Sequence, residues 1–94
     1  EVTAVVALSS QTYGAQDARL IAPRPLLLVH GEDDQRLPPR NSRTIYLWAN
    51  EPKEIVLYPG AGHGLRQCKD ELHDLLKRWL VDKLRDTANG HNQV

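Results

Sequence analysis

Several residue types and patterns are scarce in this 94-residue chain, and each shortage narrows what the chain can be. A single cysteine, Cys68, excludes an internal disulfide and cannot form a zinc site alone. The chain has no signal-peptide pattern and no apolar run near the roughly 20 residues that span a bilayer. Basic and acidic residues number 12 each, so no charge excess points to nucleic acid or to an anionic membrane. We expect neither nucleic acid nor a membrane as a partner. We expect the protein to lie in a reducing, cytoplasmic compartment.

Motifs for a nucleophile, a nucleotide or a metal are also missing. No Gly-x-Ser-x-Gly occurs, and no Gly-x-Gly-x-x-Gly follows a strand, which disfavours a flavodoxin-like or nucleotide-binding half-domain. No His-x-x-x-His or Cys-x-x-Cys pair is present, although His30, Asp33, Asp34 and His63 could approach one edge of a sheet. We therefore expect no metal and no other cofactor.

What is present alternates between strand and helix patterns. Short apolar runs rich in β-branched residues or leucine predict three strands, at residues 2–8, 25–30 and 54–58. Prolines at 38 and 39 open a helix over residues 39–49, with Ile45, Trp48 and Ala49 expected to face the sheet. Residues 16–22 allow one or two helical turns. The alternation predicts an α/β fold with parallel strands and helices on both faces, a three-layer α/β/α arrangement.

The final helix carries one apolar stripe at helical spacing. The stripe consists of Leu72, Leu75, Leu76, Trp79, Leu80 and Leu84. We expect residues 1–86 to form one portion of a single domain and residues 87–94 to form a polar, disordered tail. Because the chain starts at Glu1 and enters an apolar run at once, it is expected to be the back part of a longer protein.

Two polar groups follow neighbouring predicted strands. Asp34 comes shortly after residues 25–30, and His63 follows residues 54–58 within the glycine-rich stretch Pro-Gly-Ala-Gly-His-Gly at residues 59–64. A strand–helix–strand crossover makes the two strands parallel, so both end at the same edge of the sheet. We therefore expect the carboxylate to contact the imidazole. A carboxylate on one ring nitrogen fixes the histidine tautomer and supports proton transfer near neutral pH.

These two stretches resemble the α/β-hydrolase family. Residues 25–38 (Pro-Leu-Leu-Leu-Val-His-Gly-Glu-Asp-Asp-Gln-Arg-Leu-Pro) are similar to its apolar strand, its His-Gly-x-x-Asp and its following Val/Leu-Pro, and residues 59–64 resemble its histidine loop. This register places the acid on Asp34 and not on Asp33. In the family the chain order is nucleophile, acid, histidine. Residues 2–85 thus resemble the C-terminal portion of the α/β-hydrolase fold.

The resemblance implies a serine hydrolase that acts on carboxylic esters or related acyl bonds. His63 would serve as general base and then general acid, and Asp34 would orient it. The nucleophile and the oxyanion loop would precede Glu1, so the isolated chain is expected to be inactive. In the intact protein the substrate would be a small-molecule ester or acyl compound, and no cofactor would be needed.

Alternatives stand beside these assignments. Asp34 could cap the helix that begins near Pro38, and Asp33 could be the acid instead. His30 and Cys68 are expected to be structural, while Ser9 and Ser10 follow a strand but lack the glycines of a nucleophile elbow. A different function is a non-catalytic binding or association module, with self-association through an exposed sheet edge at residues 2–8.

Overall fold

The structure is a computed structural model that describes residues 4–11 and 15–92, with side chains for 4–11 and 17–85. The predicted order of strands and helices is confirmed. In chain order the elements are β1 Val5–Leu8, the 3₁₀ helix η1 Ala15–Leu20, β2 Leu26–Gly31, α1 Arg40–Trp48, β3 Lys53–Tyr58, the 3₁₀ turn η2 Arg66–Cys68 and α2 Lys69–Asn92. The first strand was predicted from residue 2, and residues 2–3 lie outside the described part.

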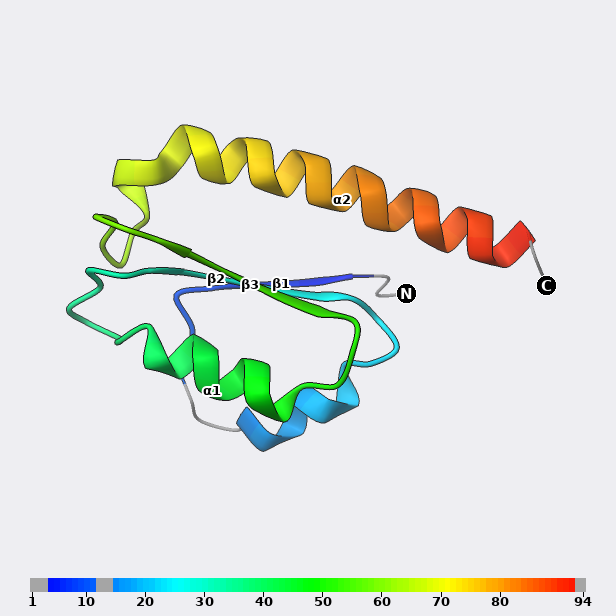
Figure 1. The fold of residues 1–94 in the computed structure, drawn as a ribbon, viewed down its shortest axis with the longest axis horizontal. Coiled ribbons are helices and arrows are strands. Elements are labelled where there is room, and N and C mark those ends of the chain that lie inside the picture. The colour runs from blue at the N-terminus through cyan, green and yellow to red at the C-terminus, as the bar shows by residue number, and fades with distance from the viewer. Residues whose placement is uncertain (1–3, 12–14, 93–94) are drawn as a thin grey trace.

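The three strands form one parallel sheet in the order β1-β2-β3. Leu8 of β1 pairs with Val29 of β2, and Gly31 at the end of β2 pairs with Tyr58 at the end of β3. Helix α2 covers one face of the sheet, while α1 and η1 cover the other (Figure 1). The predicted three-layer α/β fold with parallel strands is confirmed.

The central strand β2 is buried along its whole length, which its continuous apolar sequence requires. Its side chains alternate between two cores because successive residues of a strand point to opposite faces. Leu27 and Val29 belong to the core beneath α2, and Leu26 and Leu28 to the core beneath α1 and η1. The strand thus anchors both layers and fixes where its carboxyl end lies.

Helix α1 faces the sheet with a different stripe from the predicted one. Ile45 and Ala49 pack into the core as expected, but Trp48 is 51% exposed, so its predicted position was wrong. Ser42 is fully buried in its place, one turn before Ile45, and Tyr46 completes the contact. The helix is rotated toward Ser42 because the Ser42 hydroxyl bonds the buried His30 side chain of β2.

Helix α2 is longer than the sheet that it covers. Leu72, Leu75, Leu76 and Trp79 pack on the core as predicted. A helix of 24 residues is about 36 Å long, whereas a six-residue strand extends only about 20 Å. The end of the stripe is exposed, contrary to the prediction: Leu80 is 37% exposed and Leu84, where the helix overhangs the sheet, is 51% exposed.

The middle of α2 is tied to β3 by polar contacts at Glu54. The Trp79 indole N–H donates to Glu54 Oε1 at 3.3 Å, and Lys83 Nζ lies 3.5 Å from the same oxygen. Beyond these contacts the helix continues to Asn92, through most of the segment predicted as a disordered tail. Among the described residues no helix, α2 included, combines the length and the apolar character that crossing a membrane requires.

Candidate active site

The loops that follow β2 and β3 are joined by backbone hydrogen bonds beyond the ends of the strands. The Glu32 N–H donates to the Tyr58 carbonyl and the Asp33 N–H to the Ala61 carbonyl, both at 2.9 Å. Parallel strands end at one edge of a sheet, and these bonds extend that pairing into the loops. The acidic segment and the glycine-rich segment therefore lie side by side, as the crossover predicts.

Gly31 permits this close approach. A Cβ atom on Gly31 would lie 2.2 Å from the Ala61 oxygen and 2.7 Å from the Gly62 oxygen, so a side chain cannot be accommodated without moving the loop. Gly60 has a different role, because it turns the chain with a φ of 76° that other residues rarely adopt. These two glycines set the path of the backbone that carries His63.

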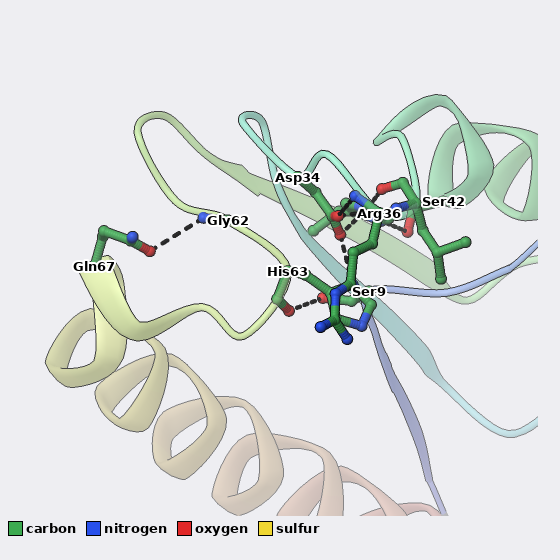
Figure 2. Close-up of polar contacts among 9 residues, drawn as sticks. Ser9, Asp34, Arg36, Ser42, Gly62, His63 and Gln67 are labelled. Atoms are coloured by element: carbon green, nitrogen blue, oxygen red, sulfur yellow. Dashed lines mark hydrogen bonds and ion pairs between the residues drawn. The ribbon is translucent and has the colours of Figure 1, made fainter.

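Asp34 is the acid that meets the histidine. Its carboxylate is fully buried, and its Oδ2 lies 2.9 Å from His63 Nδ1 (Figure 2). Its other oxygen, Oδ1, accepts the backbone N–H groups of Arg36 and Leu37, each at 2.9 Å. The carboxylate therefore caps the turn at residues 34–37. The alternative that it caps helix α1 is wrong, since the helix has its N-cap at Pro39 without a side-chain cap bond.

The surroundings of Asp34 keep it ionised. Burial alone raises the pKa of the Asp34 carboxyl. Hydrogen bonds from the Leu37 N–H, from His63 and from the Arg36 N–H outweigh burial and lower that pKa from 3.8 to about 2. At neutral pH the carboxylate carries its full negative charge and faces the His63 ring.

His63 is held by its backbone as well as by its ring. The Ser9 hydroxyl donates to the His63 carbonyl at 2.8 Å, and the Gly62 N–H donates to Gln67 Oε1 at 3.1 Å (Figure 2). The His63 side chain is 36% exposed, so solvent can reach the ring. Since its Nδ1 faces a carboxylate that can only accept, Nδ1 carries the proton and Nε2 is the basic nitrogen.

Ser9 is a structural part of the site that the sequence did not reveal. It follows β1 with a φ of 53°, and its N–H donates to the Val29 carbonyl at 2.8 Å. Its hydroxyl proton is engaged by the His63 carbonyl and not by the ring. The arrangement gives Ser9 a role in holding the histidine loop.

His30 and Ser42 form a buried pair behind the acid. Neither side chain is exposed, and His30 Nδ1 lies 2.7 Å from the Ser42 hydroxyl. His30 Nε2 lies 2.6 Å from the Leu37 carbonyl and 3.0 Å from Asp34 Oδ2. The position fits the expected role of pinning the end of β2. Ser42 was missed because a serine on a helix gives no signal of burial by itself.

The side chains of Asp33, His73 and Cys68 are not part of the acid–histidine pair. Asp33 is exposed, and His73 is exposed on α2. Cys68 is buried, and burial together with the nearby Glu71 raises the pKa of its thiol, which disfavours a reactive thiolate. The described residues include no group of three or more histidine, cysteine, aspartate or glutamate side chains placed to hold a metal ion.

The sequence of the chain is similar to parts of longer proteins. No protein-family model matches the chain. The chain is 33% identical to the uncharacterized protein YfhR of Escherichia coli strain K12 over 72 residues, which are 77% of this chain and 25% of that protein. It is 40% identical to the uncharacterized protein PA2218 of Pseudomonas aeruginosa PAO1 over 72 residues, which are 76% of this chain and 17% of that protein. The chain thus spans a quarter or less of the length of these relatives.

One solved structure is informative. The fold is similar to the crystal structure of the esterase domain from a Rhodothermus marinus protein, with a TM-score of 0.62 and 30% sequence identity. The likeness covers 69% of this chain and 29% of that chain. The chain therefore has an α/β fold that is hydrolase-like.

Replacement of Gly31 by alanine should displace the histidine loop, because the new Cβ would meet the Ala61 oxygen. We expect Gly31→Ala to lower the free energy of unfolding by about 2 kcal/mol or more and to remove the downfield proton resonance of His63 Nδ1. Urea denaturation and NMR measure the two effects. Gly62→Ala is the control, since a Cβ there meets nothing within 4 Å. Equal behaviour of the two variants would contradict the assignment.

The stability of the chain should depend on Asp34 at acid pH. Because the folded-state pKa lies below the unfolded value, the ionised carboxylate stabilises the fold fully above pH 3.8. This contribution is lost as the pH falls from 3.8 to about 2. We expect the difference in unfolding free energy between the wild type and Asp34→Asn to shrink over that window. A difference that stays constant down to pH 2 would exclude the effect.

Proposed function

We propose that this chain is the C-terminal portion of a serine hydrolase of the α/β-hydrolase class, acting on carboxylic esters or related acyl bonds. The observation that carries the proposal is the 2.9 Å contact between the buried, ionised Asp34 carboxylate and the partly exposed His63 ring. The esterase domain with a similar fold supports the same class of chemistry.

The pair would act by proton transfer. Asp34 fixes the proton on Nδ1, so Nε2 of His63 would take the proton of an attacking serine hydroxyl. The resulting imidazolium is stabilised by the carboxylate, and it would then protonate the leaving alcohol. Nε2 would next take a proton from the water that releases the acyl group from the serine, and return it to the serine oxygen. The substrate would be a small-molecule ester or acyl compound, and no step in this sequence requires a cofactor.

The isolated chain should have no significant esterase activity, because the acid and the histidine would lack their nucleophile. We expect purified wild-type chain and His63→Ala to hydrolyse p-nitrophenyl acetate at the same rate. The control is His73→Ala, which removes an exposed imidazole from α2. A rate that falls in His63→Ala but not in His73→Ala would overturn the expectation, since His63 would then act on the ester without an upstream serine.

The proposal is tested by reading the gene sequence upstream of the codon for Glu1. A reading frame that continues upstream of Glu1 should encode Gly-x-Ser-x-Gly between a strand and a helix pattern. The longer polypeptide should hydrolyse p-nitrophenyl esters, and Asp34→Asn and His63→Ala should each abolish most of that activity. A stop codon immediately upstream would contradict the proposal.

A second candidate function is association through the edge of β1. In the described sheet β1 pairs with β2 on one side only. The N–H groups of Val5 and Ser9 point toward β2, so those of Val6 and Leu8 point away from it. Leu8 is 46% exposed at this edge. An edge of this kind can pair with another strand.

Proline at position 8 should block this association. We expect the wild-type chain to show concentration-dependent oligomers in sedimentation velocity, and Leu8→Pro to reduce them, because proline removes the outward N–H while keeping the bonds to β2. Leu8→Thr is the matched control, since it removes the exposed apolar side chain and retains the N–H. A monomeric wild type at all concentrations would exclude this function.

A further inference from the structure

The buried histidine behind the acid is a titratable group that the proposed proton transfer does not use. His30 lies at the end of β2 and is fully buried. A buried imidazole is costly unless both ring nitrogens have partners. Both ring nitrogens of His30 have partners, and these contacts also affect how Asp34 is held.

The contacts fix the tautomer of His30. The Leu37 carbonyl, 2.6 Å from Nε2, can only accept a hydrogen bond, so Nε2 carries a proton. The N–H bonds the Leu37 carbonyl, and Asp34 Oδ2 lies 3.0 Å from the same nitrogen as a charged neighbour. In the neutral ring, Nδ1 then accepts the proton of the Ser42 hydroxyl at 2.7 Å. With the proton on Nε2, both ring nitrogens of His30 have a hydrogen-bond partner.

Asp34 Oδ2 therefore lies between two imidazole rings. His63 Nδ1 approaches at 2.9 Å and His30 Nε2 at 3.0 Å. The two rings differ in exposure, because the His63 side chain is 36% exposed and the His30 side chain is not exposed at all. One ring is thus accessible for proton transfer, and the other is fixed within the protein on the far side of the acid.

We infer that His30 is a positioning residue for Asp34 and His63, which holds Oδ2 of the carboxylate toward His63 Nδ1. Ser42 of α1 supports it, so that Ser42, His30, Asp34 and His63 form one series of polar contacts from the helix layer to the exposed ring. The inference rests on the proposed function only for the catalytic meaning of the Asp34–His63 pair.

The consequence is a stronger hydrogen bond between Asp34 and His63. A carboxylate that is held in place keeps its oxygen aligned with the His63 N–H better than one that can rotate about its Cβ–Cγ bond. His30 Nε2 donates to the Leu37 carbonyl, and the Leu37 N–H donates to Asp34 Oδ1. Without the His30 donor, Leu37 is held less firmly and Oδ2 loses its neighbour at 3.0 Å, so the carboxylate is less constrained. Loss of that donor should therefore weaken the hold on the His63 Nδ1 proton.

Two substitutions separate this role from packing. In His30→Gln the amide N–H would lie at the same distance along the side chain as Nε2, whereas in His30→Asn it would reach only to the position of Nδ1. We expect His30→Asn to move the His63 Nδ1 proton resonance of the 94-residue chain upfield and to speed its exchange with water about threefold or more. His30→Gln should restore the wild-type resonance and exchange rate. Folded Asn and Gln variants that both keep the wild-type values would overturn the inference.

A measurement on the wild type keeps the inference testable even if the variants do not fold. A long-range ¹H–¹⁵N spectrum should show His30 as the Nε2–H tautomer with a slowly exchanging proton. An Nδ1–H tautomer would overturn the inference, since Nε2 could then donate nothing to the Leu37 carbonyl and would turn a lone pair toward Asp34 Oδ2. Neither readout depends on catalysis. An inactive longer polypeptide would therefore contradict the proposed function without contradicting the positioning role of His30.

Discussion

A buried carboxylate that stays ionised needs hydrogen bonds on both oxygens, and the carboxyl edge of this sheet is built around that requirement. Asp34 Oδ1 accepts two backbone N–H groups from its own loop, and Oδ2 accepts the His63 Nδ1–H and lies 3.0 Å from His30 Nε2. The acid is therefore oriented largely by the segment that carries it. The histidine arrives at a partner whose direction is already set, which is the preorganisation that proton transfer favours.

All three strands contribute to holding that histidine. β1 ends at Leu8, and the hydroxyl of the next residue, Ser9, holds the His63 carbonyl. β2 ends at Gly31, whose missing side chain lets the histidine loop come close, and β3 leads into the loop itself. Because parallel strands deliver their ends to one edge, three short strands suffice to assemble the acid–histidine pair. This explains how a chain spanning a quarter or less of its relatives' length can contain the complete pair.

Much of this arrangement could be predicted from the sequence. Strand and helix order, the parallel crossover and the meeting of the acidic segment with the histidine loop follow from apolar patterning and from the handedness of crossovers. The choice of Asp34 over Asp33 came from the resemblance of residues 25–38 to the α/β-hydrolase motif. The roles of Ser9 and Ser42 could not be predicted, because a hydroxyl gives no periodic signal and its partner is a distant backbone or ring atom. Trp48 was misplaced for a related reason: bonding of Ser42 to His30 rotates α1, and apolar spacing alone ignores a buried polar contact.

The same buried contact bears on the chemistry that the pair can perform. A carboxylate and an imidazole can remove a proton from a hydroxyl or a thiol, and pairs of this kind serve esterases, thioesterases and acyltransferases alike. Substrate choice therefore depends on groups outside the pair, while the orientation of the base depends on how firmly Asp34 is held. That second property lies within this chain, because the donors to Asp34 come from the loop after β2 and from His63, and His30 lies against the same carboxylate. A fold can thus vary its substrate pockets freely while the end of β2 keeps the acid and its histidine aligned.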